Sequence, residues 1–284
     1  VGSANLSTID RIDYSNDSAN ALARSNLSTP SPWFFGSATS NTSYGWFGSA
    51  KMGTSLVERL DFENDTANTS PKGNLSQARY YLAGTGNADY GYFIGGSTPS
   101  ESSTIDRIDY SNDTATAAVK GPLSTPRRIT GATGNQSFGY AGGGATGNGG
   151  PDVTTVDRID YSNDTPTTSL KGPLSSARQY HTAHGNANFG YFVGDKGNGA
   201  PGGGSVIDRI DYGNDTSTAS PKGALSPDVG YFSGTGSASF GYSGGGSPKN
   251  SRINRIDYSN DTTVTTPVGH LSITRAYLTG AVSG

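Results

Sequence analysis

Residues 105–113 read Ile-Asp-Arg-Ile-Asp-Tyr-Ser-Asn-Asp, and variants of this phrase begin at Ile9, Val57, Val156, Ile207 and Ile253. Successive copies lie 48, 48, 51, 51 and 46 residues apart. A leucine follows the start of every copy after 18 residues, at Leu27, Leu75, Leu123, Leu174, Leu225 and Leu271. Two landmarks in fixed phase indicate six copies of one structural unit.

Within one unit, strand-like runs alternate with turn residues. Residues 79–83 (Arg-Tyr-Tyr-Leu-Ala) predict a first strand, 84–89 a turn, and 90–94 (Tyr-Gly-Tyr-Phe-Ile) a second strand. Residues 104–110 predict a third strand, and a short fourth strand is expected at 115–119, after a tight Ser-Asn-Asp-Thr turn. No run shows the 3.6-residue periodicity of an amphipathic helix. The sequence therefore predicts four antiparallel strands in each unit.

The composition is unusual for a folded chain. Leucine, isoleucine, valine and phenylalanine together supply only 46 of the 284 residues, and 42 residues are glycine. This apolar share lies below the usual globular level of about 20%. Disorder, however, also requires high net charge and few aromatic residues, whereas this chain has a net charge of −3, 16 tyrosines and 10 phenylalanines. We expect a folded protein that uses tyrosine where others use leucine.

Four-stranded repeats of about 40–50 residues are typical of β-propeller blades. The sequence thus predicts an all-β, six-bladed propeller formed by residues 1–284 as a single domain. First strands are expected near residues 31, 79, 127, 178, 229 and 275. The chain ends in a first-strand pattern and begins like the end of a second strand, so residues 1–25 should complete the last blade. Sharing one blade between the two ends would close the ring and leave little sheet edge exposed.

The units resemble the kelch repeat family. Residues 93–96 (Phe-Ile-Gly-Gly) match the family's strand ending in a double glycine, 57–62 (Val-Glu-Arg-Leu-Asp-Phe) its third strand, and 173–178 (Pro-Leu-Ser-Ser-Ala-Arg) its crossover. The resemblance covers all six units. The chain departs from the family where alanine replaces its tryptophan, and where the double glycine becomes Gly48-Ser49 and Gly194-Asp195. These departures concern the packing more than the expected fold.

A narrower resemblance concerns the particular residues of the repeat. The phrases Asp-Arg-Ile-Asp-Tyr-Ser-Asn-Asp-Thr, Lys-Gly-Pro-Leu-Ser and Phe-Gly-Tyr-Phe are similar to tandem kelch-like repeats in structural proteins of marine, cyanobacterium-infecting tailed phages. The resemblance implies one propeller of a virion protein, such as a fibre or adhesin. It also implies a location in the virion, or otherwise outside the cell. No catalytic motif accompanies it.

Several classes of function are disfavoured by the residues. Without cysteine there is no disulfide, thiolate metal site or cysteine nucleophile. Acidic and basic residues are interspersed, so we expect no nucleic acid partner. No run approaches about 20 apolar residues, so we expect no membrane span. The opening Val1-Gly2-Ser3 lacks an initiator methionine and a secretory signal pattern, and we expect it to be a cut.

Enzymatic activity and a cofactor are not expected. Galactose oxidases, which are kelch-like propellers, need a tyrosine crosslinked to cysteine, and sialidase-type propellers need repeated boxes that contain tryptophan. This chain has no cysteine and two tryptophans, Trp33 and Trp46. His181 and His184 lie close enough in sequence to suggest a metal site with Asp195. Because only one unit carries them, we expect no metal and interpret both as ordinary surface or channel residues.

The repeated acidic and basic residues favour a structural role. A catalytic pair of carboxylates needs two different environments, whereas repetition gives every copy the same one. We expect the arginines to be held by neighbouring carboxylates and to lock blade to blade. The residues of this repeat motif are Asp10, Arg11, Asp13, Arg59, Asp106, Arg107, Asp157, Arg158, Asp208, Arg209 and Arg255.

A binding site is expected where the copies differ, because packing requirements are shared by all blades. The loop between the second and third strands varies most in length, and the residue after the crossover arginine varies in type. In kelch-type blades these two segments lie on one face of the disc, and loops on a rigid scaffold commonly bind ligands. The candidate ligand-binding residues are Tyr80, Arg128, Gln179, His181 and Tyr231.

The sequence favours a non-enzymatic binding or structural module of a phage virion that contacts the host surface. Two alternatives stay open. A lectin would carry weak carbohydrate sites strengthened by multivalency. A purely structural virion scaffold would bind no small ligand, its glycine-rich loops serving as spacers. The partner is accordingly a host-surface glycan or protein, or another virion protein.

Overall fold

The computed structural model describes residues 7–28, 36–48, 54–128, 131–147, 150–194, 204–227, 230–276 and 278. These residues form antiparallel β-sheets and no α-helix; two short 3-10 turns, η1 (Tyr110–Asn112) and η2 (Tyr212–Asn214), are the only helical segments among them. In this described part of the chain, no helix is long and apolar enough to cross a membrane.

Five four-stranded sheets form the blades. Blade 1 contains β3 (Ser37–Ser40), β4 (Tyr44–Gly48), β5 (Val57–Asp61) and β6 (Ser70–Pro71). Blade 2 contains β7 (Ala83–Gly86), β8 (Tyr90–Ile94), β9 (Ile105–Asp109) and β10 (Ala118–Lys120). Blade 3 contains β11 (Gly131–Gly134), β12 (Phe138–Gly142), β13 (Val156–Asp160) and β14 (Ser169–Leu170). Blade 4 contains β15 (Thr182–Gly185), β16 (Phe189–Val193), β17 (Ile207–Asp211) and β18 (Ser220–Pro221). Blade 5 contains β19 (Ser233–Gly236), β20 (Phe240–Gly244), β21 (Asn250–Asp257) and β22 (Thr266–Arg275).

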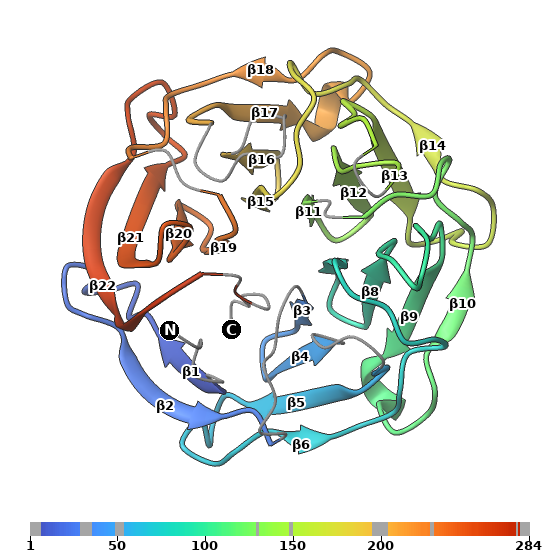
Figure 1. Ribbon diagram of the computed structural model, residues 1–284, viewed down its shortest axis with the longest axis horizontal. Coiled ribbons are helices and arrows are strands. Elements are labelled where there is room, and N and C mark those ends of the chain that lie inside the picture. The colour runs from blue at the N-terminus through green and yellow to red at the C-terminus, as the bar shows by residue number, and fades with distance from the viewer. Residues whose placement is uncertain are drawn as a thin grey trace.

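The sheets are arranged around a common centre, which identifies the fold as a β-propeller (Figure 1). In each blade the chain runs from the innermost strand to the outermost one (Figure 1). A two-stranded sheet of β1 (Thr8–Arg11) and β2 (Leu22–Asn26) lies between blade 5 and blade 1 (Figure 1). Of the six predicted units, the described residues therefore show five as four-stranded blades and one as two strands.

The strand pattern predicted for one unit is confirmed for its second strand, β8, and is wrong for its first. The first strand was expected at residues 79–83, but β7 begins at Ala83 and includes residues assigned to the turn. Tyr81 has a φ of +61°, which no extended strand accommodates. Gly84 lies within β7. Glycine is required there because a Cβ would lie 2.4 Å from the carbonyl oxygen of Ala38 in the neighbouring innermost strand. Close approach of the innermost strands thus selects glycine, which sequence analysis interprets as a turn residue.

Tyrosine occupies the core, as the composition predicts. Tyr92, Tyr140, Tyr191 and Tyr242 of the second strands are at most 1% exposed. Each stacks on a tyrosine of the next sheet, with ring centroids 4.7–4.9 Å apart. The hydroxyl of Tyr92 donates to Asp164 of blade 3 at 2.9 Å, so the ring packs while its polar end stays bonded. Tyrosine therefore joins neighbouring blades through both packing and hydrogen bonding.

A glycine at the end of the fourth strand sets the spacing between neighbouring blades. A Cβ on Gly172, which follows β14 of blade 3, would lie 1.9 Å from the backbone oxygen of Ser217 in blade 4, and the equivalent glycines show the same approach. We predict that Gly172→Ala lowers the free energy of unfolding by about 3 kcal/mol, because backbone must shift at a packed interface. Gly213→Ser is the control, since its added Cβ meets only Asp211 Oδ1 at 3.3 Å and serine stands there in other units. Urea unfolding of both variants measures the difference; equal stability would contradict the prediction.

Candidate functional site

Arginines of the third strands link each sheet to the next. Their Nη1 atoms lie 2.7–2.9 Å from an aspartate carboxylate in the following turn. The six pairs are Arg11–Asp65, Arg59–Asp113, Arg107–Asp164, Arg158–Asp215, Arg209–Asp261 and Arg255–Asp17. Among the predicted motif residues, Arg11, Arg59, Arg107, Arg158, Arg209 and Arg255 thus bridge from blade to blade.

The guanidinium groups of these arginines also cover aromatic rings. Arg107 lies 4.2 Å from the ring centroid of Tyr90, and the blade arginines equivalent to it repeat this cation–π contact. Asp13 instead accepts hydrogen bonds from the hydroxyl and amide of Ser15, which lower the pKa of its carboxyl. Most of the repeat motif is therefore occupied by contacts that shape turns and interfaces.

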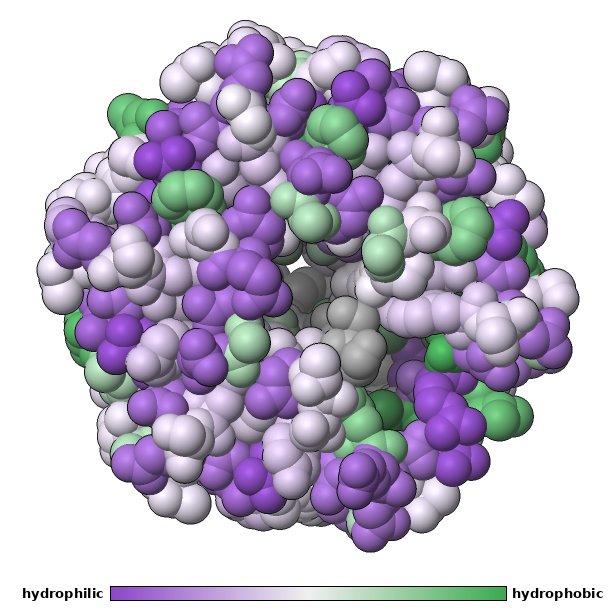
Figure 2. Space-filling view, turned by 180° about the vertical axis from the view of Figure 1, so that it is seen from behind, coloured by the Kyte–Doolittle hydropathy of each residue, from purple (hydrophilic) through white to green (hydrophobic). Residues whose placement is uncertain are grey.

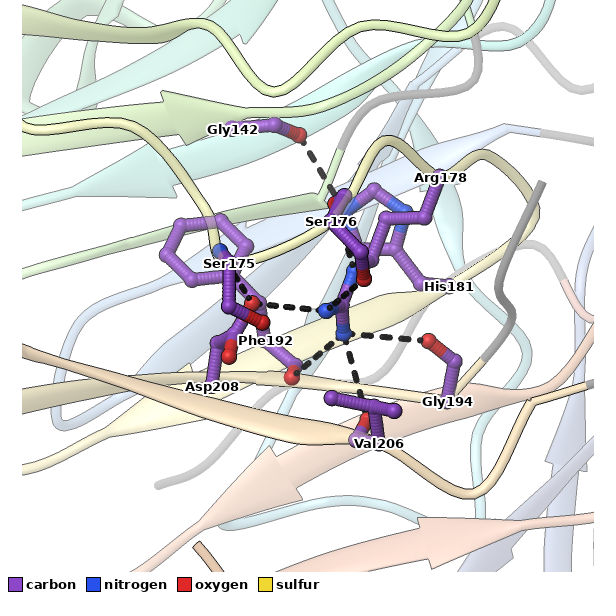
Figure 3. Close-up of polar contacts among 9 residues, drawn as sticks. All are labelled: Gly142, Ser175, Ser176, Arg178, His181, Phe192, Gly194, Val206 and Asp208. Atoms are coloured by element: carbon purple, nitrogen blue, oxygen red, sulfur yellow. Dashed lines mark hydrogen bonds and ion pairs between the residues drawn. The ribbon is translucent and has the colours of Figure 1, made fainter. Parts of the chain in front are cut away.

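A second set of ion pairs is buried inside the blades. In blade 4, Arg178 Nη2 lies 2.6 Å from Asp208 Oδ2, and both side chains are 0% exposed. Arg178 also donates to the backbone oxygen of Val206 at 3.2 Å (Figure 3). Equivalent pairs are Arg79–Asp106, Arg127–Asp157 and Arg275–Asp10. Asp10, Asp106, Asp157 and Asp208 thus hold the arginine that ends each crossover, and this contact fixes where the next residues emerge.

The crossover and the loop after the second strand lie on the same face. Tyr80 pairs with Ser97 across an antiparallel bridge, and Arg128 pairs with Ala145 in the same way. One residue further along, Tyr81, Tyr180 and Tyr231 have φ values of +57° to +61°. Left-handed backbone at a non-glycine residue costs free energy and is concentrated at functional sites. We call Tyr80, Tyr81, Arg128, Tyr180 and Tyr231 the crossover rim.

The rim residues form two groups. In the first, Tyr80 and Tyr81 have ring centroids 4.9 Å apart, and the Arg128 guanidinium lies 5.4 Å from the Tyr81 ring. Arg128 also lies 3.5 Å from a carboxylate oxygen of Glu101. In the second group, Tyr180 and Tyr231 of adjacent blades have ring centroids 4.0 Å apart. One group therefore combines aromatic rings with charge, and the other is built on neutral phenols.

The structure separates the predicted ligand-binding residues. Tyr80, Arg128 and Tyr231 are half-buried on the rim, whereas Gln179 and His181 are only 8% and 7% exposed. The sequence analysis missed Tyr81 and Tyr180. A usable signal was present, since tyrosine recurs two residues after the crossover arginine position in four of the six units.

The two histidines are buried, which corrects their interpretation as surface or channel residues. His181 Nε2 lies 3.1 Å from both the Gly142 oxygen and the Gly131 nitrogen, and Figure 3 shows it beside Arg178. His184 Nδ1 lies 2.9 Å from the Tyr258 hydroxyl, at the position where other blades place threonine. Burial lowers the pKa of each to about 3. They pack between blades. Within the described residues, no group of three or more potential ligands is placed to hold a metal ion, and Asp195 lies outside those residues.

Comparison with known proteins supports the fold. No family model matches the chain, and neither does any curated protein. The chain is similar to a solved structure described as "Structure of YjhT", with a TM-score of 0.73 over 90% of this chain and 89% of that one. The sequence identity is 12%. At that identity the likeness shows a shared propeller fold and carries no information about the ligand.

Proposed function

We propose that this protein is a non-enzymatic binding module and that the crossover rim is its ligand-binding face. The left-handed backbone at Tyr81, Tyr180 and Tyr231 carries the proposal. Isolated left-handed tyrosines are strained, and the same strain at three equivalent positions indicates that the placement of these rings is selected. Tyrosine combines a large apolar ring with a hydroxyl and loses little side-chain entropy on binding, which suits a recognition surface.

The opposite hypothesis, catalysis, has less support. The repeated carboxylates and arginines that could serve as acids or bases are engaged with one another at 2.5–2.9 Å. Both buried histidines bond to neighbouring groups inside the packing. A proton-transfer residue must reach a substrate, and these side chains are directed into interfaces.

We further propose that the complete ring has six blades, with the β1–β2 sheet as the outer half of the sixth. Arg255 of blade 5 bonds to Asp17 of this sheet, and Arg11 of the sheet bonds to Asp65 of blade 1. These contacts are equivalent to those between successive blades. Arg275 at the end of β22 also reaches Asp10 at 2.8 Å, as a blade's own crossover arginine does elsewhere. The inner strands that the sequence predicts from the two termini fall largely on residues 1–6, 277 and 279–284, which lie outside the described residues.

The amino-acid sequence of the repeat supports a place in the virion of a tailed phage, with the rim facing the host surface. Of the possible partners, a surface glycan fits the rim best, because aromatic rings with adjacent polar groups are typical of sugar-binding sites. Figure 2 shows the molecule from behind, where hydrophilic and hydrophobic residues are interspersed without a broad apolar patch. A scaffold packed permanently through this face against another virion protein would be expected to expose such a patch here.

Binding to intact cells tests this proposal. Labelled protein is added to candidate hosts, including cyanobacteria, and to arrays of their surface polysaccharides, with free sugars as competitors. We expect saturable, sugar-competed binding that weakens at least tenfold in the double variant Tyr81→Ala/Tyr231→Ala. The control is Val119→Ser/Leu170→Ser, which changes two exposed residues of the outermost strands.

Two results would overturn the proposal. Absence of binding to cells and glycans would favour a structural virion module, and equal weakening in the control variant would show that the rim is not the binding face. Melting temperatures of both variants establish that each is folded.

A further inference from the structure

The pair Tyr180 and Tyr231 is a preformed aromatic surface between blades 4 and 5. Its ring planes are inclined by 36°, with centroids 4.0 Å apart. The backbone holds the pair in place, because the amide of Tyr231 donates to the carbonyl oxygen of Tyr180 at 3.0 Å. Both φ values, +57° and +58°, lie in the left-handed region. Both residues are half-buried, so each keeps part of its surface accessible.

Gln179, immediately before this pair, carries an unsatisfied acceptor. The residue is 8% exposed, and its Oε1 has no hydrogen-bond partner. A buried acceptor left without a donor costs about 1–3 kcal/mol. Leucine in the same place would avoid that cost, and a donor that arrives with a ligand would remove it.

The three side chains at this place, two phenols and one amide, carry no charge of their own. The nearest cation in sequence, Arg178, is bonded to Asp208 inside blade 4, and Figure 3 shows its guanidinium directed toward Asp208, Val206 and Gly194. The other rim group differs, because Arg128 and Glu101 bring charge to the Tyr81 ring. Phenols and an amide, without a free charge, suit a neutral polyhydroxylated ligand better than an anionic one.

We propose that Gln179, Tyr180 and Tyr231 form a subsite for one neutral pyranose ring. A C–H face of the sugar packs on the tyrosine rings, and one hydroxyl donates to Gln179 Oε1. This inference rests on the proposed function of the crossover rim and names the ligand class of one part of it. A single subsite of this size binds weakly, so avidity on a cell would come from the remaining rim.

Titration with methyl pyranosides tests the subsite. Tyrosine signals in NMR spectra are followed while the methyl glycosides of glucose, galactose and mannose are added, with a glucuronic acid glycoside as the anionic comparison. At least one neutral sugar should shift the signals saturably, at least tenfold more tightly than the anionic one. We expect Gln179→Leu to weaken binding at least fivefold without lowering the melting temperature, and Tyr231→Ala to abolish it. Val119→Ser/Leu170→Ser, which changes two exposed residues of the outermost strands, is the control and should bind the monosaccharide unchanged.

The possible failures are distinguishable. If cells are bound but no neutral sugar shifts the signals, or if Gln179→Leu and Tyr231→Ala bind normally, the subsite is wrong and the wider binding function stands. If neither cells nor sugars are bound, both proposals fail. Preference for the anionic sugar would also overturn the subsite and direct attention to Arg128.

Discussion

Replacing Asp208 by alanine should lower the free energy of unfolding by about 3–5 kcal/mol. The substitution leaves the Arg178 guanidinium fully buried without its carboxylate, and removal of one partner of a buried ion pair is costly for this reason. It also removes the acceptor of the Ser175 amide, which lies 3.0 Å from Asp208 Oδ2 (Figure 3). Urea unfolding, followed by circular dichroism, gives the change in free energy.

The chain supplies its own control for this experiment. In blade 5, Val229 and Asn254 stand at the sequence positions that Arg178 and Asp208 occupy in blade 4. The double variant Arg178→Val/Asp208→Asn should therefore recover most of the lost stability, because it removes both charges together. If the double variant is no more stable than Asp208→Ala, uncompensated charge is not the cause of the loss.

Acid should destabilise the protein through His181 and His184. Their pKa values in the folded state are about 3, below the unfolded value of about 6.5, so the unfolded chain binds more protons between these limits. Stability is therefore complete above about pH 6.5 and falls as the pH decreases toward 3. The two groups together should cost about 3 kcal/mol between pH 6.5 and pH 5. Denaturant unfolding over this pH range measures the slope.

A variant with the residues of other units isolates the histidine contribution. His181→Leu/His184→Thr places leucine as in Leu82 and threonine as in Thr85 at the equivalent positions. This variant should lose most of the slope between pH 6.5 and pH 5. A slope of unchanged size would assign the acid sensitivity to the carboxylates instead.

The repeat made the fold predictable from the sequence. The positions of the innermost strands could not be predicted, because they depend on local backbone geometry. The position of β8 and the core role of tyrosine could be inferred, since periodicity and composition survive in one sequence. The inner strands were misplaced because glycine normally marks turns, whereas Gly84 is selected by contact with the next strand. Such a contact joins two units and is invisible in the local sequence.

The sequence identified the crossover segment that carries the candidate site, but it identified only some of the residues within that segment that face outward. Variation after the crossover arginine pointed to Tyr80, Arg128 and Tyr231, which lie on the rim. It also pointed to His181, whose ring is turned into the blade packing. The directions in which the crossover side chains point depend on the left-handed residue within each crossover. A φ of +57° at Tyr180 cannot be inferred from the presence of a tyrosine in the sequence.

The arginine–aspartate links have a direction, since every sheet offers its arginine to the following sheet and its aspartate to the preceding one. A whole unit of 46 to 51 residues therefore carries both halves of the junction. Duplicating or deleting such a unit in the gene would leave every remaining junction with a matching partner. The interface thus permits growth by tandem copying, while the surface residues of each copy remain free to diverge.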